Sequence, residues 1–454
     1  MHSKLNGNES PAQTGDINRR EFMAAVGTVG VLGASRSLLP SWMPRMAFRS
    51  PQQMAQADLS NSGGSSSNSP GDVLLCIFLR GGIDGLSAVV PFGEGGNYYD
   101  ARPTLSVAEP GERSGALDLN GYFGLHPALA PIRDIYSEGD LLVIHAAGLT
   151  DPSRSHFDAM RFMELGTPGS KSTTSGWLAR HLQSAAWQNL SPFRAVGMGA
   201  MVPESLRGPI SPLSLRSIAD FHFKGRQDEL RQLQQSLSSI YSIDTPTDQA
   251  NPSALSQQAG MVFDTIETLQ GLDATNYRPN NGVTYPDSEF GLGLQQVAQL
   301  AKADVGLEVA CVDLGGWDTH ESQGTLDGYF NQLLTELGNG LGAFYADMEG
   351  YMSNVTVVTM SEFGRRVQEN GSQGTDHGHG NVMFVMGGGA KGGQVYSDWP
   401  TLAPEALNDG DLAITTDYRD VLAEVISKRL NNQALAQIFP GHTVTDLGLL
   451  EQRV

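Results

Sequence analysis

The residues best suited to metal chemistry lie in one stretch, Val355–Asn381. It begins with an apolar, β-branched run that is typical of a buried strand, and Glu362 follows at the end of that run. Asp376, His377 and His379 come soon after, within four residues of the chain. In an open α/β sheet, ligands bind beyond the carboxyl ends of the strands. An acid at a strand end, followed by an Asp-His-Gly-His loop, therefore predicts a metal site.

A second loop with carboxylates and an imidazole follows another apolar run, residues 307–312. Asp313, Asp318 and His320 occupy this loop. Asp318 and His320 are two residues apart and can point at one ion, while Asp313 is near enough to add an outer carboxylate. The alternative is a polar loop with a capping Asp.

Glycines and an aspartate follow the first long apolar run of the chain, residues 72–79. Asp84 lies in the sequence Arg80-Gly-Gly-Ile-Asp84-Gly, where glycines let the backbone approach a ligand closely. We therefore predict Asp84 as a further metal ligand. The alternative is an ordinary strand-to-helix turn with Asp84 as the N-cap of the helix.

Hydroxyl groups gather at the elbow between the apolar run 140–146 and the helix that follows it. Thr150, Ser153, Arg154 and Ser155 lie in this elbow. A helix N-terminus stabilises anions and a nucleophilic alkoxide alike. A metal bound to Ser155 Oγ would make it a better nucleophile, and Arg154 could hold a phosphate or sulfate oxygen. The alternative is a serine N-cap with an acid in the first turn.

These loops are predicted to share one edge of a parallel sheet, because each follows the carboxyl end of a buried strand. Such a cluster of carboxylates and imidazoles suits one or two divalent ions. The imidazoles favour zinc, with manganese or magnesium as alternatives, and argue against calcium. A Ser-His-Asp hydrolase is disfavoured, because the chain has no GxSxG elbow. His156, adjacent to Ser155, cannot easily turn back as its base.

The composition describes a globular protein with an acidic surface. The chain has 454 residues, of which 40 % are hydrophobic and 54 are glycine, and a net charge of −20. Nucleic-acid binding needs a basic face, so this charge argues against that class and against electrostatic docking to an anionic membrane. Cys76 and Cys311 lie in apolar, strand-like runs and are predicted as buried thiols rather than a disulfide.

The N-terminal residues are predicted to lie outside the fold. Residues 1–50 resemble a twin-arginine export signal, with Arg19-Arg20 ahead of a Gly/Ala-rich run that is too short for a stable transmembrane helix. Residues 51–71 are predicted as a flexible Gly/Ser/Gln linker. We therefore expect an exported protein, periplasmic or extracellular, that uses the twin-arginine export machinery and folds over 72–454. The alternative is a chance pair of arginines ahead of an amphipathic helix.

Five motifs behind this signal make the chain resemble the exported bacterial family called domain of unknown function 1501. They are RGGIDGLS, SRSHFDAM, GGWDTH, SEFGRR and TDHGHG, in that order, and the resemblance covers roughly residues 72–400. That family is similar to the alkaline phosphatase and sulfatase superfamily. The resemblance implies an α/β fold, a three-layer α/β/α sandwich with a mostly parallel central sheet, and leaves the activity open.

The superfamily pattern also implies roles for individual residues. Its aspartate at the end of the first strand matches Asp84, and its Ser or Thr nucleophile matches Ser155 best, then Thr150, then Ser153. In alkaline phosphatases an acid precedes an aspartate by five residues and a histidine follows shortly after. The loop from Asp313 to His320 reproduces this order, with the histidine two residues early.

The largest departure from the superfamily is Phe363. The usual Ser-Asp-His-Gly is replaced here by Ser-Glu-Phe-Gly, and Phe363 cannot ligate a metal. Either Glu362 compensates together with His377 or His379, or Asp376 and His377 form a displaced Asp-His-Gly.

The expected function is hydrolysis of a small-molecule or polymer-linked phosphate or sulfate ester by an exported, metal-dependent enzyme. The first alternative is a non-catalytic binding or assembly protein that retains a structural metal site. The second is a sugar- or polymer-binding protein of the cell surface. It would use a helical insertion, predicted over residues 205–290 from the helical periodicity of 216–244 and 254–272.

Overall fold

Apolar, β-branched runs form the long strands of one mixed sheet in this computed structural model of the chain. The structure describes residues 72–186, 189–219, 265, 268–269, 272 and 276–453. The predicted export signal and linker lie outside the described residues.

Nine strands among the described residues make up the main sheet. In spatial order they are β11 (Gln394–Tyr396), β5 (Leu141–Gly148), β10 (Asn381–Gly387), β9 (Val355–Met360), β1 (Val73–Arg80), β8 (Val309–Gly315), β6 (Ala195–Met198) and β7 (Leu213–Leu215), with β12 (Thr416–Asp417) beside β5.

All neighbouring strands of the main sheet run parallel except β10, which is antiparallel to both β5 and β9. The carboxyl ends of β1, β5, β8 and β9 therefore meet at one edge, together with the amino end of β10. This arrangement confirms the prediction of a mostly parallel sheet. It brings the loops with carboxylates and imidazoles to the same edge.

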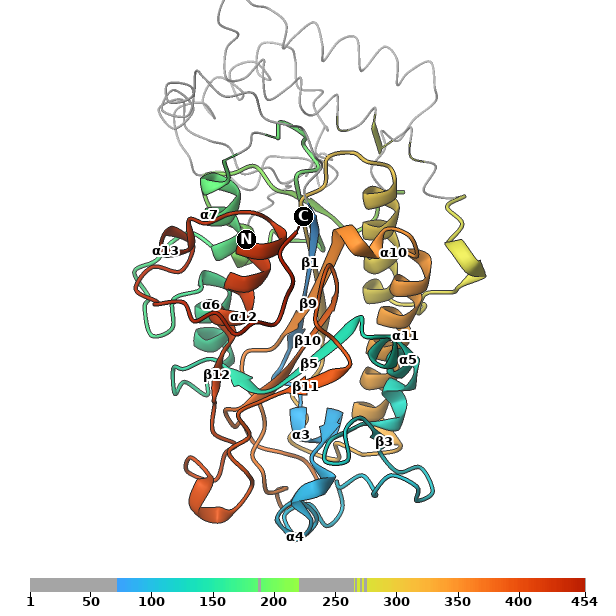
Figure 1. Ribbon diagram of the computed structural model, residues 1–454, viewed down its shortest axis with the longest axis vertical. Helices are drawn as coiled ribbons and strands as arrows, with labels where there is room; N and C mark the ends of the chain where they lie inside the picture. Colours follow the sequence, from blue (N-terminus) through green and yellow to red (C-terminus); the bar gives the residue numbers. More distant parts are fainter. Residues whose placement is uncertain are drawn as a thin grey trace, which may run out of the picture. The chain divides into compact units, whose positions relative to one another are not determined.

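Alternate side chains of each strand enter two cores, one on either face of the sheet. Leu75 and Ile77 of β1 belong to one core, and Leu74 and Cys76 belong to the other. Figure 1 shows a layer of helices on each side of the sheet, which confirms the α/β/α sandwich. The first core is covered by α5 (Arg133–Glu138), α10 (Glu289–Lys302) and α11 (Gly328–Asp347), and the second by α6 (His156–Leu165), α7 (Trp177–Ser184), α12 (Tyr418–Glu424) and α13 (Leu435–Ile438).

Shorter elements join these layers. A small antiparallel sheet contains β2 (Val89–Val90), β4 (Gly124–Leu125) and β3 (Leu117–Asp118), and the short helices are α3 (Gly85–Ala88) and α4 (Gly96–Tyr99). The 3₁₀ turns are Phe92–Glu94, Pro127–Ile132, Glu204–Leu206, Asn280–Gly282, Met352–Asn354 and Pro404–Ala406, and a π-helical turn, Val425–Arg429, follows α12.

The predicted helical insertion over 205–290 contains a strand of the main sheet. Its described part includes β7, so residues 213–215 pair with β6 and do not belong to a helical cap. The two predicted helices lie largely outside the described residues, and the insertion stays a prediction.

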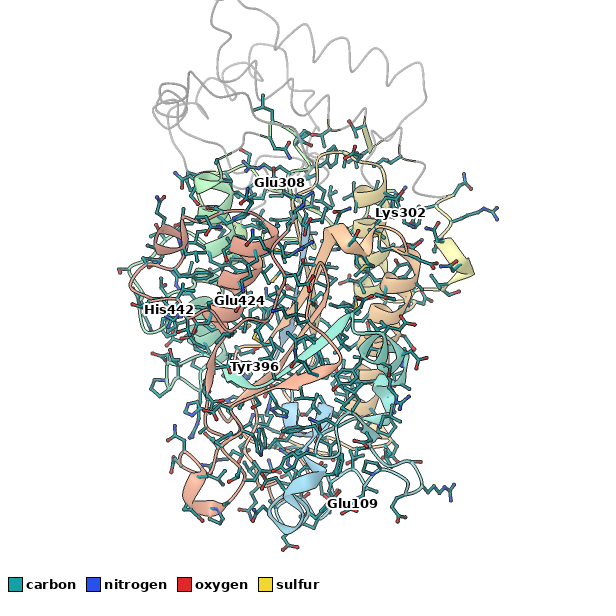
Figure 2. All side chains as sticks on the ribbon, viewed as in Figure 1. Glu109, Lys302, Glu308, Tyr396, Glu424 and His442 are labelled. Carbon is teal, nitrogen blue, oxygen red and sulfur yellow. The ribbon has the colours of Figure 1, made fainter. Side chains whose placement is uncertain are left out.

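A buried carboxylate joins α10 to α11. Lys302, at the end of α10 (Figure 2), donates to Asp347 at the end of α11. Tyr277 and Tyr285 donate to the same carboxylate at 2.7 and 2.8 Å. Burial alone would raise the pKa of Asp347, but these hydrogen bonds outweigh it and hold the pKa below its ordinary value of 3.8.

The two cysteines are free and buried, as predicted. Cys76 of β1 and Cys311 of β8 are neighbours in the strand register. Burial raises the pKa of the Cys76 thiol to about 12, so this thiol stays protonated at neutral pH. Among the described helices, none has the length and apolar character that a membrane span requires.

Candidate metal centre

Three side chains from different parts of the chain bring their ligand atoms together at the carboxyl edge of the sheet. They are His156 at the start of α6, Asp318 in the loop after β8 and His377 in the loop before β10, and their ligand atoms lie within 4.8 Å of one another. His377 Nε2 is 3.1 Å from Asp318 Oδ1, and His156 Nε2 is 3.4 Å from the same oxygen. His320 adds a fourth donor, because its Nε2 is 3.1 Å from Asp318 Oδ1. We call these four residues the histidine cluster.

The other nitrogen of each imidazole contacts an oxygen that can only accept a hydrogen bond. We therefore assign the proton of each ring to Nδ1, which leaves an unprotonated Nε2 facing the cluster. The acceptors are Arg154 O for His377 (2.8 Å), Glu362 Oε1 for His156 (2.8 Å) and Asp376 Oδ1 for His320 (3.0 Å).

Lone pairs thus face one another without a proton between them. His320 Nε2 and His377 Nε2 are 2.9 Å apart, and each lies 3.1 Å from Asp318 Oδ1. His156 Nε2 is a buried atom with no hydrogen-bond partner in the described part of the chain. A divalent cation would relieve this repulsion, and imidazole nitrogen with carboxylate oxygen is a donor set that zinc prefers. The acceptors on Nδ1 match the outer contacts that orient metal-binding histidines.

The electrostatics put two of the donors in the form that binds a cation. Burial raises the pKa of Asp318, but the hydrogen bond and the positive charge of Arg365 outweigh it and hold that pKa at about 2. Burial lowers the pKa of His377, which is therefore neutral at neutral pH. His156 differs, because its hydrogen bond to Glu362 raises its pKa, so protonation competes with an ion at this ligand.

Two motifs pair with each other to place His377. Gly364 N donates to His379 O at 2.9 Å, and Gly378 N donates to Gly364 O at 2.8 Å. A Cβ on Gly364 would stand 2.0 Å from Gly380 O, so the two segments can approach this closely only because position 364 is glycine. The SEFGRR and TDHGHG segments therefore form one short ribbon that ends in the histidine cluster.

Phe363 packs against the histidines instead of binding an ion. Its side chain is buried, and its ring lies 4.8 Å from the His156 ring and 4.6 Å from the His377 ring, centre to centre. Phe363 thus restricts the orientation of two imidazoles from the apolar side. This contact gives a structural role to the residue that departs most from the superfamily pattern.

Glu362 and Asp376 were predicted as metal ligands, and the structure places both behind the histidines. Glu362 is fully buried, and its Oε1 accepts from His156 Nδ1 and from Gly81 N, both at 2.8 Å. Asp376 accepts from His320 Nδ1. Their geometry fits residues that orient ligands better than it fits ligands.

Asp84 and Asp313 were also predicted as ligands, and the structure places both with arginines. Asp84 is fully buried, with Arg102 Nη1 at 2.5 Å. Asp313 Oδ2 accepts from Arg80 Nε at 2.7 Å. Neither carboxylate contacts the histidine cluster among the hydrogen bonds and ion pairs of the described residues, so the geometry gives no support to ligation by either.

His379 lies beside Asp411 rather than in the histidine cluster, although it was predicted as a ligand. Its Nδ1 is 3.5 Å from Asp411 Oδ2, and Asp411 also accepts from Arg154 and Arg366. The Arg154 guanidinium is therefore engaged with a buried carboxylate, while the Arg154 carbonyl accepts from His377.

The predicted nucleophiles lie at the elbow before α6. Ser155 is the N-cap residue of α6, and its exposed hydroxyl makes no capping hydrogen bond. Thr150 is also exposed, and the hydroxyl of Ser153 accepts from Ser155 N at 3.3 Å. A nucleophilic role for any of the three stays a prediction.

Two residues of the centre were not anticipated from the sequence. His156 was considered only as a base for Ser155, although an imidazole one residue into the helix faces the same sheet edge as the other loops. Arg365, whose Nη2 donates to Asp318 Oδ1 at 2.9 Å, lies in the SEFGRR motif and is fully buried. Its position soon after a predicted strand end, at the same sheet edge as the other loops, could have indicated that this arginine belongs to the centre.

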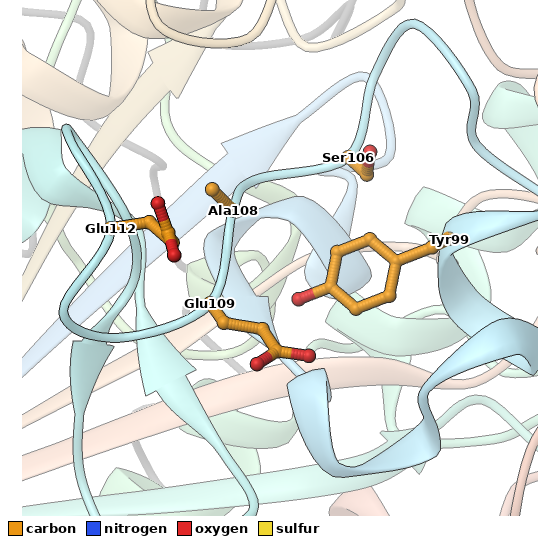
Figure 3. Close-up of a pocket in the computed structure, with 5 residues that line it drawn as sticks. All are labelled: Tyr99, Ser106, Ala108, Glu109 and Glu112. Carbon is orange, nitrogen blue, oxygen red and sulfur yellow. The ribbon is translucent and has the colours of Figure 1, made fainter.

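A pocket also lies elsewhere on the molecule. It has a volume of about 420 Å³, and Figure 3 shows Tyr99, Glu109 and Glu112 among its lining residues. None of its lining residues belongs to the histidine cluster. The pocket contains no imidazole, so we place the candidate centre at the cluster and not here.

Comparison with solved structures gives distant similarities. The lipoteichoic acid synthase LtaP from Listeria monocytogenes is 9 % identical, with 83 % of this chain and 75 % of that chain covered and a TM-score of 0.32. Ps i-CgsB, in complex with k-i-k-neocarrahexaose, is 10 % identical over 85 % and 75 %, with a TM-score of 0.33. BT1596, a 2-O GAG sulfatase, is 12 % identical over 73 % and 67 %, with a TM-score of 0.26. Similarities of this strength say nothing about the chemistry of this chain.

Comparison with curated proteins finds no match. The family model described as protein of unknown function (DUF1501) matches residues 144–429. This span runs from within β5 to the π-helical turn after α12 and contains four of the five motifs. Because it covers more than half of the chain, the protein belongs to the DUF1501 family.

Proposed function

We propose that the protein is a metal-dependent hydrolase of phosphate or sulfate esters, with its ion held by three residues of the histidine cluster, His156, Asp318 and His377. The observation that carries this proposal is the convergence of unprotonated imidazole nitrogens on Asp318 Oδ1, each backed by an acceptor on Nδ1. Zinc fits these donors best, with manganese or magnesium as alternatives. When bound, such an ion acts as a Lewis acid on an ester oxygen and activates a nucleophile.

The residues of this chain would share the remaining tasks. Ser155 is the preferred nucleophile, because its exposed hydroxyl stands at the N-terminus of α6 directly before His156 and is free of a capping bond. Glu362 and Asp376 would orient the imidazoles behind the ion. Phe363 would exclude water from the inner side of the centre.

Elemental analysis of the purified protein, paired with turnover of aryl phosphates and aryl sulfates, tests the proposal. We expect bound zinc or manganese, and a turnover that is lost in Asp318→Ala and in Ser155→Ala. Ser153→Ala is the matched control and should retain turnover, because it removes a neighbouring hydroxyl that matches the superfamily nucleophile less well than Ser155 does. Full metal content with no turnover of either ester class would count against a hydrolase.

One observation favours a second candidate, a non-catalytic protein with a structural ion. If His320 binds together with the other three residues, four protein donors complete a tetrahedral shell and leave no open position for a substrate. In that case Ser155→Ala should leave function intact, while His377→Ala should lower the melting temperature of the metal-loaded protein.

We also propose that the protein is exported to the periplasm or beyond by the twin-arginine machinery. The support is the Arg19-Arg20 pair with the apolar run that follows it. Replacing both arginines with lysine should leave the protein in the cytoplasmic fraction. Unchanged export of the double variant would refute this route.

A further inference from the structure

Arg365 brings a buried positive charge into contact with the proposed ligand Asp318. Its Nη2 donates to Asp318 Oδ1 at 2.9 Å, and the Arg365 side chain is fully buried. Its Nε donates to Gly82 O at 2.7 Å, and its Nη1 donates to Thr375 O at 2.8 Å. The guanidinium therefore ties together the loops after β1 and β8 and the loop before β10. Because all its nitrogens are engaged, it stands as a fixed charge beside the centre.

The charges around the centre suit one divalent ion. Asp318, Glu362 and Asp376 contribute three negative charges and Arg365 one positive charge, which leaves −2 when the histidines are neutral. One divalent ion cancels this charge. A second ion would leave an excess of two positive charges in a partly buried site, where charges are poorly screened.

A second ion would need further carboxylates at this sheet edge. Those carboxylates are already paired with arginines. A two-ion centre needs oxygen donors that are shared between ions about 4 Å apart. Among the hydrogen bonds and ion pairs of the described residues, none of these carboxylates contacts the histidine cluster, so none is placed to share an oxygen with its ion. The pairs are Asp84 with Arg102 (2.5 Å), Asp313 with Arg80 (2.7 Å) and Asp411 with Arg366 (3.2 Å).

We propose that the centre holds a single divalent ion, and that Arg365 takes the place of a second cation while it aims Asp318 at the first. This inference rests on the proposed function, because it assumes that the histidine cluster binds metal. Arg365 is a positioning residue: it acts on the ion through Asp318 and does not touch a substrate.

The number of ions separates this inference from the proposed function. The purified full chain would be stripped with a chelator, loaded with excess Zn²⁺, desalted and measured by elemental analysis. We expect one equivalent of zinc. Two equivalents would overturn the single-ion centre and leave the proposed hydrolase standing, whereas no bound zinc would overturn both.

Variants of Arg365 test its positioning role by zinc affinity rather than by turnover. Arg365→Gln should weaken zinc binding about 10- to 100-fold, the range for residues that orient a ligand. Arg365→Lys keeps the charge but loses the planar fork, and should lose less affinity. Arg80→Gln is the matched control, because it removes a guanidinium from Asp313, and should bind zinc like the unaltered protein.

A cobalt-substituted sample distinguishes aiming of Asp318 from a merely structural role. The visible absorption of bound Co²⁺ reports the geometry of its ligands, so it should shift in Arg365→Lys and stay unchanged in Arg80→Gln. Folded Arg365 variants with unaltered zinc affinity and an unaltered cobalt spectrum would overturn the proposed role. If Arg365→Gln does not fold, the zinc affinity and cobalt spectrum of Arg365→Lys still test the positioning role. The zinc count of the unaltered protein still tests the single-ion centre.

Discussion

Removing the charge of Glu362 while keeping its shape tests whether outer carboxylates tune the histidine cluster. The Glu362 side chain is fully buried, and one of its oxygens accepts from both His156 Nδ1 and Gly81 N at 2.8 Å. In Glu362→Gln the amide oxygen can accept from the same two donors. The substitution therefore removes a charge and leaves most of the geometry in place.

The expected loss follows from the role of Glu362 at His156. Its hydrogen bond is the largest cause of the raised pKa of His156, so a neutral partner makes this imidazole a weaker base and a weaker ligand. Loss of such an outer partner weakens metal binding about 10- to 100-fold. At about 1.4 kcal/mol for each tenfold change, the cost is about 1.4–2.8 kcal/mol of binding free energy.

Competition between the protein and a chromophoric chelator for Zn²⁺ measures this loss. Glu164→Gln is the matched control, because Glu164 is a buried carboxylate on the same helix as His156 but pairs with Arg80 at 3.2 Å. Melting in excess chelator reports whether each variant is folded. If both variants fold and bind zinc as tightly as the unaltered protein, the reasoning about outer carboxylates is wrong.

Three further predictions concern single side chains. Asp84→Asn should cost about 3–5 kcal/mol of unfolding free energy, because it leaves the buried Arg102 without its counter-ion, while zinc affinity stays unchanged; weaker zinc binding would restore Asp84 as a ligand. His320→Ala should weaken zinc binding but retain one ion by elemental analysis, since three donor atoms remain within 4.8 Å of one another. Complete loss of zinc would contradict an ion that is held by His156, Asp318 and His377 alone. The pKa of Asp347 is held below 3.8, so its contribution to stability is present above that pH and is lost as the pH falls through the lowered pKa. The free energy of unfolding in urea, measured between roughly pH 2 and 4, should therefore fall more steeply with decreasing pH for the unaltered protein than for Asp347→Asn. Equal slopes would refute this expectation.

The architecture could be predicted from the sequence because its long strands are local patterns. The runs that became β1, β5, β8, β9 and β10 are apolar over most of their length, and each is followed or preceded by a loop with polar side chains. Such runs indicate strands buried on both faces. The gathering of the loops at one sheet edge followed from that alone.

The division of the acids into ligands and partners could not be predicted, because it depends on contacts between distant residues. Asp313 pairs with Arg80 across 233 positions of the chain, and His156 meets Glu362 across 206. A carboxylate that binds an ion and one that holds an imidazole are the same residue type. The two kinds of carboxylate differ only in whether they face the Nε2 side or the Nδ1 side of an imidazole ring.

The reversed strand β10 has a consequence for the order in which the centre assembles. Because β10 is antiparallel to β9, the two form a local hairpin, and the loops that carry Glu362 and His377 belong to that one hairpin. His156 arrives from a helix more than 200 positions away, and pairing over such a separation comes late in folding. An ion that needs all of these residues would bind only after the folding barrier is crossed. Zinc should therefore slow unfolding far more than it speeds folding, which stopped-flow kinetics with and without chelator can check. Bound metal would then set how long the folded protein lasts rather than how fast it forms.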